Sequence, residues 1–210
     1  MSDLATPKST QDTIFPEQYL FALNFICALV YLHMVFFSGF VALCFTWWAQ
    51  LHIDSKQFVP LDLIEVEDGD TFVIHWPDAQ PETVRILGID TAEIQHEIPK
   101  MDDQPYGTEA RGFFTGVLAT TRTARITRCE QPDKYGRTLA YLYVDRRNYS
   151  ELVVRARLAY ESVSKYGDNG FPDEAALILS AYQDAIKEGP LPFENPSDFR
   201  ARMREKYPVN

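Results

Sequence analysis

The N-terminal quarter of the chain carries its longest hydrophobic segment. No Asp, Glu, Lys or Arg occurs in the range Gln18–Ile53. A helix needs about 20 predominantly apolar residues to cross a membrane, and residues 19–48 exceed that length. Aromatic side chains such as Trp48 stand at the ends of the segment, where they typically anchor a span at the membrane interface. We therefore predict one N-terminal transmembrane helix within residues 18–51.

A signal peptide and a buried core helix both fit this segment less well. A cleaved signal peptide starts with basic residues and has an apolar stretch of only about 7 to 15 residues. This segment instead follows a polar tail, residues 1–17, that contains acidic residues. A buried core helix is normally shorter and has a polar face. Residues 52–59 then form a short linker to the rest of the chain.

Beyond residue 60 the pattern changes to short segments typical of a folded domain. Strand-like stretches rich in β-branched and aromatic residues cover residues 63–68, 71–76, 82–89, 124–130 and 137–144. Helical spacing of apolar residues covers residues 108–121, 149–160 and 173–189. Five short strands predict a small sheet or barrel, so the expected class is α+β, mainly β.

The last predicted helix ends at Gly189 and Pro190, which together form a typical helix stop. We therefore expect one domain over residues 60–190. Residues 191–210 form a C-terminal tail, basic near its end, that is loosely held or contains a short helix.

The charge of the chain is unevenly distributed. A net charge of −10 argues against a nucleic-acid partner. Residues 61–109, however, carry a net −11, whereas residues 122–157 carry a net +5. The acidic part is suited to a cation and the basic part to an anion. An ordinary acidic surface with a few exposed arginines accounts for the same counts.

Three separated segments concentrate residues suited to one chemistry. They read DGDT, RILGIDTAE and DKYGR, at residues 68–71, 85–93 and 133–137. Carboxylate oxygens at turns suit Ca²⁺, which accepts water for the ligands that the protein lacks. Arginine forks suit a phosphodiester, and a further carboxylate can deprotonate an attacking water. Together these groups indicate a hydrolase of phosphodiesters.

Each segment alone is also an ordinary turn or strand end, because Asp and Gly are favoured turn residues. The strand pattern poses a further condition. Arg85 and Asp90 are five residues apart, and strict alternation would place them on opposite faces of a strand. A bend or bulge near Gly88 is needed to bring both into one pocket.

The motifs resemble the staphylococcal-type nucleases, or thermonucleases, over residues 60–190. The segments that carry the resemblance read, in order, VEDGDTF, VRILGIDTAE, YGTEA, DKYGRTLAYLYVD and LVVRARLAY. The resemblance implies a five-stranded OB-type barrel with three helices, which agrees with the strands and helices expected from the pattern. In this chain the barrel would be preceded by the transmembrane helix.

The resemblance also implies a role for each matching position. The Ca²⁺ ligands would be the carboxylates of Asp70 and Asp90 and the backbone carbonyl of Thr91. The remaining roles fall to Asp68 as support for the metal site, Glu93 as general base, and Arg85 and Arg137 as the groups that grip the scissile phosphate. Candidate substrate contacts are Lys134, Tyr135 and Tyr166. Two positions depart from the family pattern. Ala92 stands where the family usually has proline. The type member has two tyrosines that flank the bound nucleotide, and here only Tyr166 lies near their position.

We therefore expect a membrane-anchored, Ca²⁺-dependent nuclease that acts on DNA and RNA with low sequence specificity and favours single strands. No obligate protein partner is expected. The catalytic domain is predicted to lie outside the cytoplasmic membrane, because free Ca²⁺ is scarce in the cytosol and a nonspecific nuclease would endanger the chromosome. The alternative is a catalytically inactive nuclease-like domain that serves as a tethered nucleic-acid or protein binding module.

Overall fold

The structure is a computed structural model that describes residues 56–97 and 100–208. The predicted transmembrane segment, residues 18–51, lies outside these described residues, as does the polar tail before it. Among the helices of residues 56–97 and 100–208, none is both long and apolar enough to span a bilayer.

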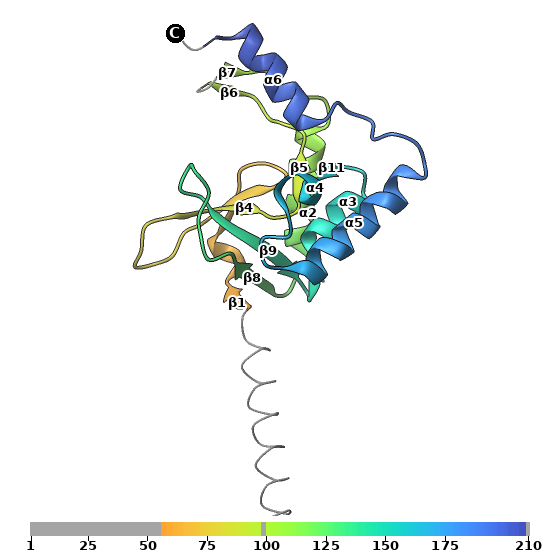
Figure 1. The fold of residues 1–210 in the computed structure, drawn as a ribbon. Coiled ribbons are helices and arrows are strands. Elements are labelled where there is room, and N and C mark those ends of the chain that lie inside the picture. The colour runs from red at the N-terminus through yellow and green to blue at the C-terminus, as the bar shows by residue number, and fades with distance from the viewer. Residues whose placement is uncertain (1–55, 98–99, 209–210) are drawn as a thin grey trace, which may run out of the picture. The chain divides into compact units, whose positions relative to one another are not determined.

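A curled, mostly antiparallel sheet forms the centre of the fold (Figure 1). Its strands run in the order β1-β8-β9-β4-β3-β2, with β10 added beside β9. They are β1 (Gln57–Val59), β2 (Ile64–Val66), β3 (Thr71–Ile74), β4 (Glu82–Ile86), β8 (Ala124–Arg128), β9 (Thr138–Val144) and β10 (Arg147–Asn148), with a 3-10 turn at Leu61–Leu63. Strands β4 and β9 pair in parallel, and all the other pairs are antiparallel. Strand β1 lies within the segment that was expected to be a linker.

Two short strand pairs form separate two-stranded sheets. Strand β5 (Ile89–Thr91) pairs with β11 (Ala159–Glu161), and β6 (His96–Glu97) pairs with β7 (Lys100–Met101). The strand predicted over residues 82–89 is therefore broken, with the chain turning at Gly88 between β4 and β5. Gly88 has a φ of +79°, a left-handed conformation that glycine adopts without steric cost. The bend expected near Gly88 is confirmed.

Five α-helices surround the sheet in the described part of the chain. They are α2 (Gly107–Thr120), α3 (Tyr149–Arg155), α4 (Val163–Tyr166), α5 (Pro172–Ile186) and α6 (Pro196–Lys206). The helix predicted over residues 149–160 is too long. It ends at Arg155 because Arg157 takes a left-handed φ of +61°, and the chain then enters β11. Helix α6 lies in the C-terminal segment that was expected to be loosely held or to contain a short helix, and the short helix is what the structure shows.

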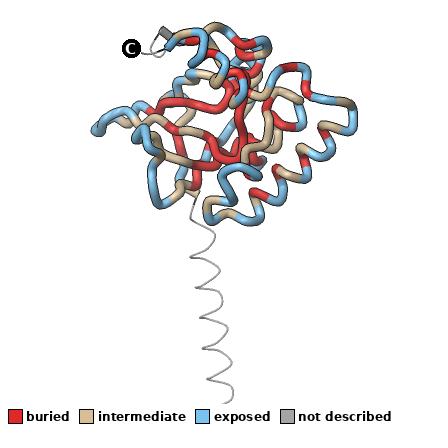
Figure 2. The backbone as a smooth tube through the Cα atoms, turned by 45° about the horizontal axis from the view of Figure 1, so that its top comes forward, coloured by how far each residue is buried: buried red, intermediate tan, exposed pale blue. Residues whose placement is uncertain are grey.

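The hydrophobic core lies where the sheet meets α2, α3 and α5, and the tube in Figure 2 is mainly buried there. Its largest fully buried side chains include Tyr141, Tyr149, Phe72 and Phe114. The rings of Phe114 and Tyr149 lie 4.3 Å apart between centroids and join α2 to α3. The predicted α+β class is confirmed, as a curled sheet covered by several helices.

Helix α6 is attached to the rest of the fold by a small cluster of its own. Phe199 and Met203 are buried against Met101 of β7, with Tyr207 partly buried beside them. The helix begins at Pro196, and the side chain of Asn195 caps it by accepting a hydrogen bond from the Ser197 N–H at 2.9 Å. This attachment places the inner face of α6 against β5 and β7.

Candidate active site

The turn before β3, Asp68-Gly69-Asp70, is held from several sides. The Asp68 carboxylate accepts a hydrogen bond from the Asp70 N–H at 2.8 Å. The Tyr149 hydroxyl, fully buried in α3, donates to the Gly69 carbonyl at 2.9 Å. A Cβ atom on Gly69 would lie only 2.7 Å from the Cβ of Ala110. The turn is therefore fixed before any ligand binds, and it gives Asp70 a set position.

Two buried carboxylates meet at one guanidinium beside this turn. Asp70 and Asp90 are 4% and 7% exposed. Arg85 forms an ion pair with Asp70 through Nη1, and its Nη2 donates to Asp90 Oδ1 at 2.8 Å. The other Asp70 oxygen accepts a hydrogen bond from the Thr91 N–H at 2.7 Å. The turn before β3 and the strands β4 and β5 thus bring Asp70, Arg85 and Asp90 together.

A second arginine, Arg200 of α6, completes the cluster. Its Nη1 and Nη2 donate to the two Asp90 oxygens at 3.0 and 2.7 Å, and Nη1 also forms an ion pair with Glu93. Burial would lower the pKa of Arg200, but the hydrogen bonds and charges of Asp90 and Glu93 raise it above its usual value. The guanidinium is therefore charged at every physiological pH.

Arg200 was not among the residues predicted from the sequence, because residues 191–210 were treated as a tail. A signal for its helix was present. Asn195 followed by Pro196 is a favoured helix start, and Phe199 and Met203 are four residues apart on one helix face. No local pattern, however, indicates that Arg200 reaches the Asp90 carboxylate.

The donor set fits a hard divalent cation. Asp70 and Asp90 already share one positive group, Arg85, so a single cation can reach both. Within residues 56–97 and 100–208, no group of three or more Asp, Glu, His or Cys side chains is arranged around a metal position. A cation here would take two carboxylates from the protein and oxygen ligands from water for the rest, which Ca²⁺ tolerates. The Thr91 N–H donates to Asp70. That the Thr91 carbonyl binds the metal stays a prediction.

The turn between β8 and β9 carries Arg137. Asp133 accepts hydrogen bonds from the N–H groups of Tyr135 and Arg137, both at 2.9 Å, and from Arg137 Nε at 2.8 Å. Burial raises the pKa of Asp133, but these bonds hold it below its usual value. The register pairs Leu139 with Arg85, and two-residue alternation puts Arg137 on the same face of the sheet. Arg137 thus falls on the sheet face that carries Arg85, and it pairs with Asp133 in its own turn.

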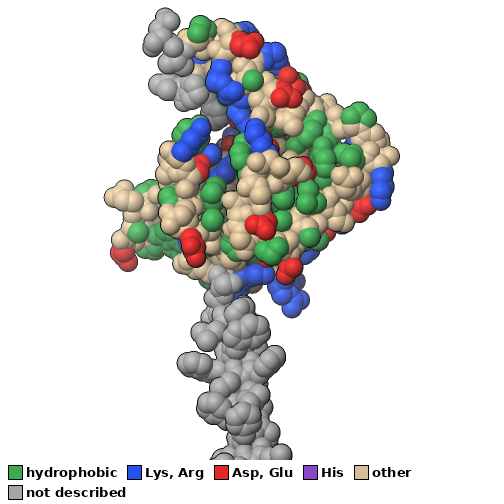
Figure 3. Space-filling model, in the orientation of Figure 1, with side chains coloured by type: hydrophobic (Ala, Val, Ile, Leu, Met, Phe, Trp, Pro, Cys, Tyr) green, Lys and Arg blue, Asp and Glu red, His purple; other side chains and the backbone are tan. Residues whose placement is uncertain are grey.

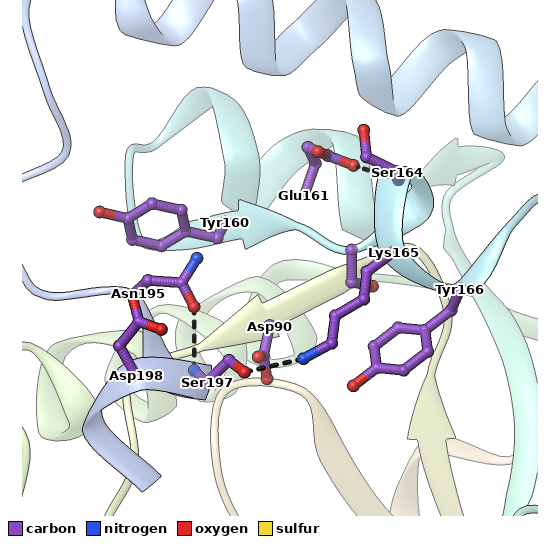
Figure 4. Close-up of a pocket in the computed structure, with 10 residues that line it drawn as sticks. Asp90, Tyr160, Glu161, Ser164, Lys165, Tyr166, Asn195, Ser197 and Asp198 are labelled. Carbon is purple, nitrogen blue, oxygen red and sulfur yellow. Dashed lines mark hydrogen bonds between the residues drawn. The ribbon is translucent and has the colours of Figure 1, made fainter. Parts of the chain in front are cut away.

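The predicted aromatic contacts lie at the surface. Tyr135 is 72% exposed and Tyr166 is 62% exposed, and Lys134 Nζ lies 4.9 Å from the Tyr135 ring centre. A cavity of about 310 Å³ opens between Tyr166 and Asp90. In Figure 4, Lys165 and Tyr166 form one side of this cavity, and Ser197 at the start of α6 forms the other. Lys165 Nζ donates to Ser197 Oγ at 2.7 Å.

The structure therefore brings most of the predicted residues together. Those in or directly beside the buried cluster are Asp68, Asp70, Arg85, Asp90, Thr91 and Glu93. Arg137, Lys134 and Tyr135 share the neighbouring β8–β9 turn, and Tyr166 lines the cavity. Ala92, at the position where proline was expected, is buried against Leu191 and Phe193, so the chain after α5 holds the segment that precedes Glu93.

Comparisons with known proteins agree with this geometry. The family model described as "Staphylococcal nuclease homologue" matches residues 83–189. A thermonuclease of Staphylococcus intermedius is 38% identical over 94 residues, which are 45% of this chain and 54% of that protein. A thermonuclease of Staphylococcus hyicus is 33% identical over 97 residues, 46% of this chain and 56% of that protein. Endonuclease YncB of Bacillus subtilis (strain 168) is 32% identical over 127 residues, 58% of this chain and 59% of that protein. The chain thus spans between half and three fifths of these relatives.

Proposed function

The chain belongs to the staphylococcal nuclease family, and from this premise we propose that it is a Ca²⁺-dependent nuclease that hydrolyses phosphodiester bonds of DNA and RNA. The observation that carries the proposal is the convergence of Asp70, Asp90 and Glu93 with arginine at one place in the fold. Relatives named thermonuclease and endonuclease support it.

Arg85 is suited to bind the scissile phosphate. A guanidinium has five N–H donors in a planar fork, and Asp70, Asp90 and the Ile89 carbonyl engage three of them. The Nε–H remains for a phosphate oxygen, and the Nη groups, freed once the carboxylates bind Ca²⁺, would stabilise negative charge that grows during attack. Arg137, on the same face of the sheet, would bind a second phosphate oxygen through its Nη groups while its Nε stays paired with Asp133.

Glu93 would accept the proton of the attacking water. As the water oxygen bonds to phosphorus, its proton passes to the Glu93 carboxylate, and the phosphorus–oxygen bond to the leaving nucleoside breaks in line with the attack. The leaving alkoxide takes a proton from solvent. Asp70 and Asp90 would hold the Ca²⁺ ion, which when bound supplies positive charge next to the phosphate.

The substrate range follows from the same contacts. Groups that bind phosphate carry little sequence information, so we propose low sequence specificity. The exposed rings of Tyr135 and Tyr166 offer stacking surfaces to unpaired bases, which supports a preference for single strands. No protein partner is needed for any of these contacts.

We also propose that residues 18–51 anchor the enzyme in a membrane, with the catalytic domain on the extracytoplasmic side. The uncharged run from Gln18 to Ile53 supports an anchor, and a requirement for Ca²⁺ supports this side. Added protease should digest the domain in intact cells. Full protection of the domain until the cells are lysed would overturn the proposed orientation.

The activity is tested by incubating the purified full-length chain with single-stranded DNA, duplex DNA or RNA, first with Ca²⁺ and then with a chelator. We expect cleavage only with Ca²⁺, fastest on single strands, and lost in Glu93→Gln and Arg85→Ala. If the chain binds DNA but never cleaves it, the inactive binding module considered from the sequence is correct instead. If cleavage survives both substitutions, the assigned roles are wrong.

A further inference from the structure

Helix α6 lies beyond residues 83–189, which match the nuclease family, yet it contributes a side chain to the proposed site. We infer, on the basis of the proposed function, that α6 is an autoinhibitory segment, which we call the strap. In the docked helix Arg200 takes the place of the cation, so docking of α6 excludes Ca²⁺. The inference concerns residues outside the range that the family model matches.

The contacts of Arg200 are those that a cation would need. It occupies both oxygens of Asp90 and also pairs with Glu93, while Arg85 takes Asp90 Oδ1 as well. A carboxylate whose oxygens are shared between two guanidiniums offers few lone pairs to a metal ion. The positive charges of a Ca²⁺ ion at Asp90 and of the Arg200 guanidinium would also repel each other strongly in this partly buried site. Ca²⁺ can therefore bind Asp90 well only after Arg200 leaves.

The strap also blocks the carboxylate proposed as general base. Glu93 pairs with Arg200 through one carboxylate oxygen, so that oxygen is occupied by the guanidinium, which competes there with a hydrogen bond from an attacking water. The start of α6 closes one side of the cavity between Tyr166 and Asp90 as well, through Ser197 (Figure 4). Docked α6 thus covers the metal ligands, the base and one approach for substrate.

Apart from the Arg200 pairs, which a bound cation would replace, the attachment of α6 is slight. Its apolar contacts form a separate small cluster around Phe199 and Met203, outside the main core. The pairs of Arg202 with Glu194 and of Lys206 with Asp102 involve exposed side chains, and such pairs contribute little to stability. Basic side chains stand over this end of the molecule (Figure 3), so a nucleic acid that approaches would also attract the released helix. Because the main core does not include this cluster, release of α6 should leave the sheet and α2, α3 and α5 intact.

Calorimetric Ca²⁺ titration of the full-length chain without nucleic acid tests the inference. Arg200→Gln should lower the dissociation constant by about tenfold, which corresponds to a native chain with α6 docked in about nine molecules of ten. The matched control is Arg202→Gln, which removes the same charge from the same helix but from an exposed pair with Glu194. Its dissociation constant should equal that of the native chain.

Hydrogen exchange on the unmutated chain gives an independent measurement. Because coupling between two binding events is reciprocal, added Ca²⁺ should speed amide exchange in residues 196–206 and leave α5 unchanged. Equal affinity in the native chain and Arg200→Gln, or slower exchange in α6 with Ca²⁺, would overturn the strap while leaving the proposed nuclease standing. If neither the native chain nor either variant binds Ca²⁺, the strap fails together with the cofactor of the proposed function.

Discussion

Replacing Gly69 by alanine tests how closely the Asp68–Asp70 turn is fitted against its neighbours. Gly69 does not have a positive φ, so alanine can adopt its backbone conformation and the effect is one of space. The added Cβ would lie 2.7 Å from the Cβ of Ala110, and 2.8 and 2.9 Å from Oγ1 and Cβ of Thr91. Carbon atoms in contact are normally about 3.5 to 4.0 Å apart, so the turn must move away by about 1 Å.

The size of the effect follows from these contacts. Both neighbours are fixed, Ala110 by α2 and Thr91 by β5, so the strain cannot be relieved by rotating a flexible side chain. Overpacking of this kind costs about 1 to 3 kcal/mol. The same movement separates Asp70 from the Thr91 N–H, a bond of 2.7 Å. Ca²⁺ affinity should therefore fall together with stability.

Urea denaturation and calorimetric Ca²⁺ titration measure the two effects. Gly112→Ala is the matched control, because an added Cβ there meets nothing within 4 Å and the residue lies inside α2. Removing glycine from a helix interior should raise the free energy of unfolding by about 0.5 to 1 kcal/mol and leave Ca²⁺ binding unchanged. If Gly69→Ala is as stable as the native chain and binds Ca²⁺ equally well, the close packing of this turn against Ala110 and Thr91 does not matter for stability or binding, and the reasoning is refuted.

Three further predictions follow from individual hydrogen bonds. Tyr149→Phe leaves the buried Gly69 carbonyl without its donor and should lower the free energy of unfolding in urea by about 1 to 3 kcal/mol; an unchanged value would contradict this bond. The hydrogen bond from Arg128 lowers the pKa of Glu82 from 4.5 to about 2. Because the folded pKa is the lower one, this pair stabilises the fold fully above pH 4.5 and loses its effect as the pH falls through about 2. Glu82→Gln should therefore be less stable than the native chain at neutral pH, with a difference that disappears toward pH 2; a difference independent of pH would refute the assignment. Asp133→Asn removes the charge that orients Arg137 and should slow cleavage by about tenfold or more without changing Ca²⁺ affinity, whereas an unchanged rate would show that Asp133 does not position Arg137.

The local elements could be predicted from the sequence because each depends on neighbouring residues. Strand β3 follows directly from the β-branched and aromatic content after Asp70, and α5 from its apolar spacing and its Gly189 stop. The turn at Gly88 was also deducible, because Arg85 and Asp90 could share a pocket only if the strand broke between them.

The errors arose where distant contacts decide the structure. The helix predicted over residues 149–160 continues in its apolar pattern, but Ala159 pairs with Thr91 and the chain enters β11 instead. Tertiary pairing of this kind overrides local propensity. Arg200 lies 110 residues from Asp90 in the chain, and its role depends on how α6 docks. A polar helix with only two buried apolar side chains in its middle, Phe199 and Met203, gives too weak a pattern to predict that docking.

The central claim is that Asp70 and Asp90 hold the Ca²⁺ ion on which cleavage depends. The most direct test measures the cleavage rate of single-stranded DNA against Ca²⁺ concentration for the native chain and for Asp70→Asn, which keeps the size of the side chain but removes its charge. We predict a saturable rise with Ca²⁺ in the native chain and a half-saturating concentration at least about tenfold higher in Asp70→Asn, since a charged ligand is lost. A cleavage rate that does not depend on Ca²⁺, or the same half-saturating concentration in both proteins, would contradict the claim.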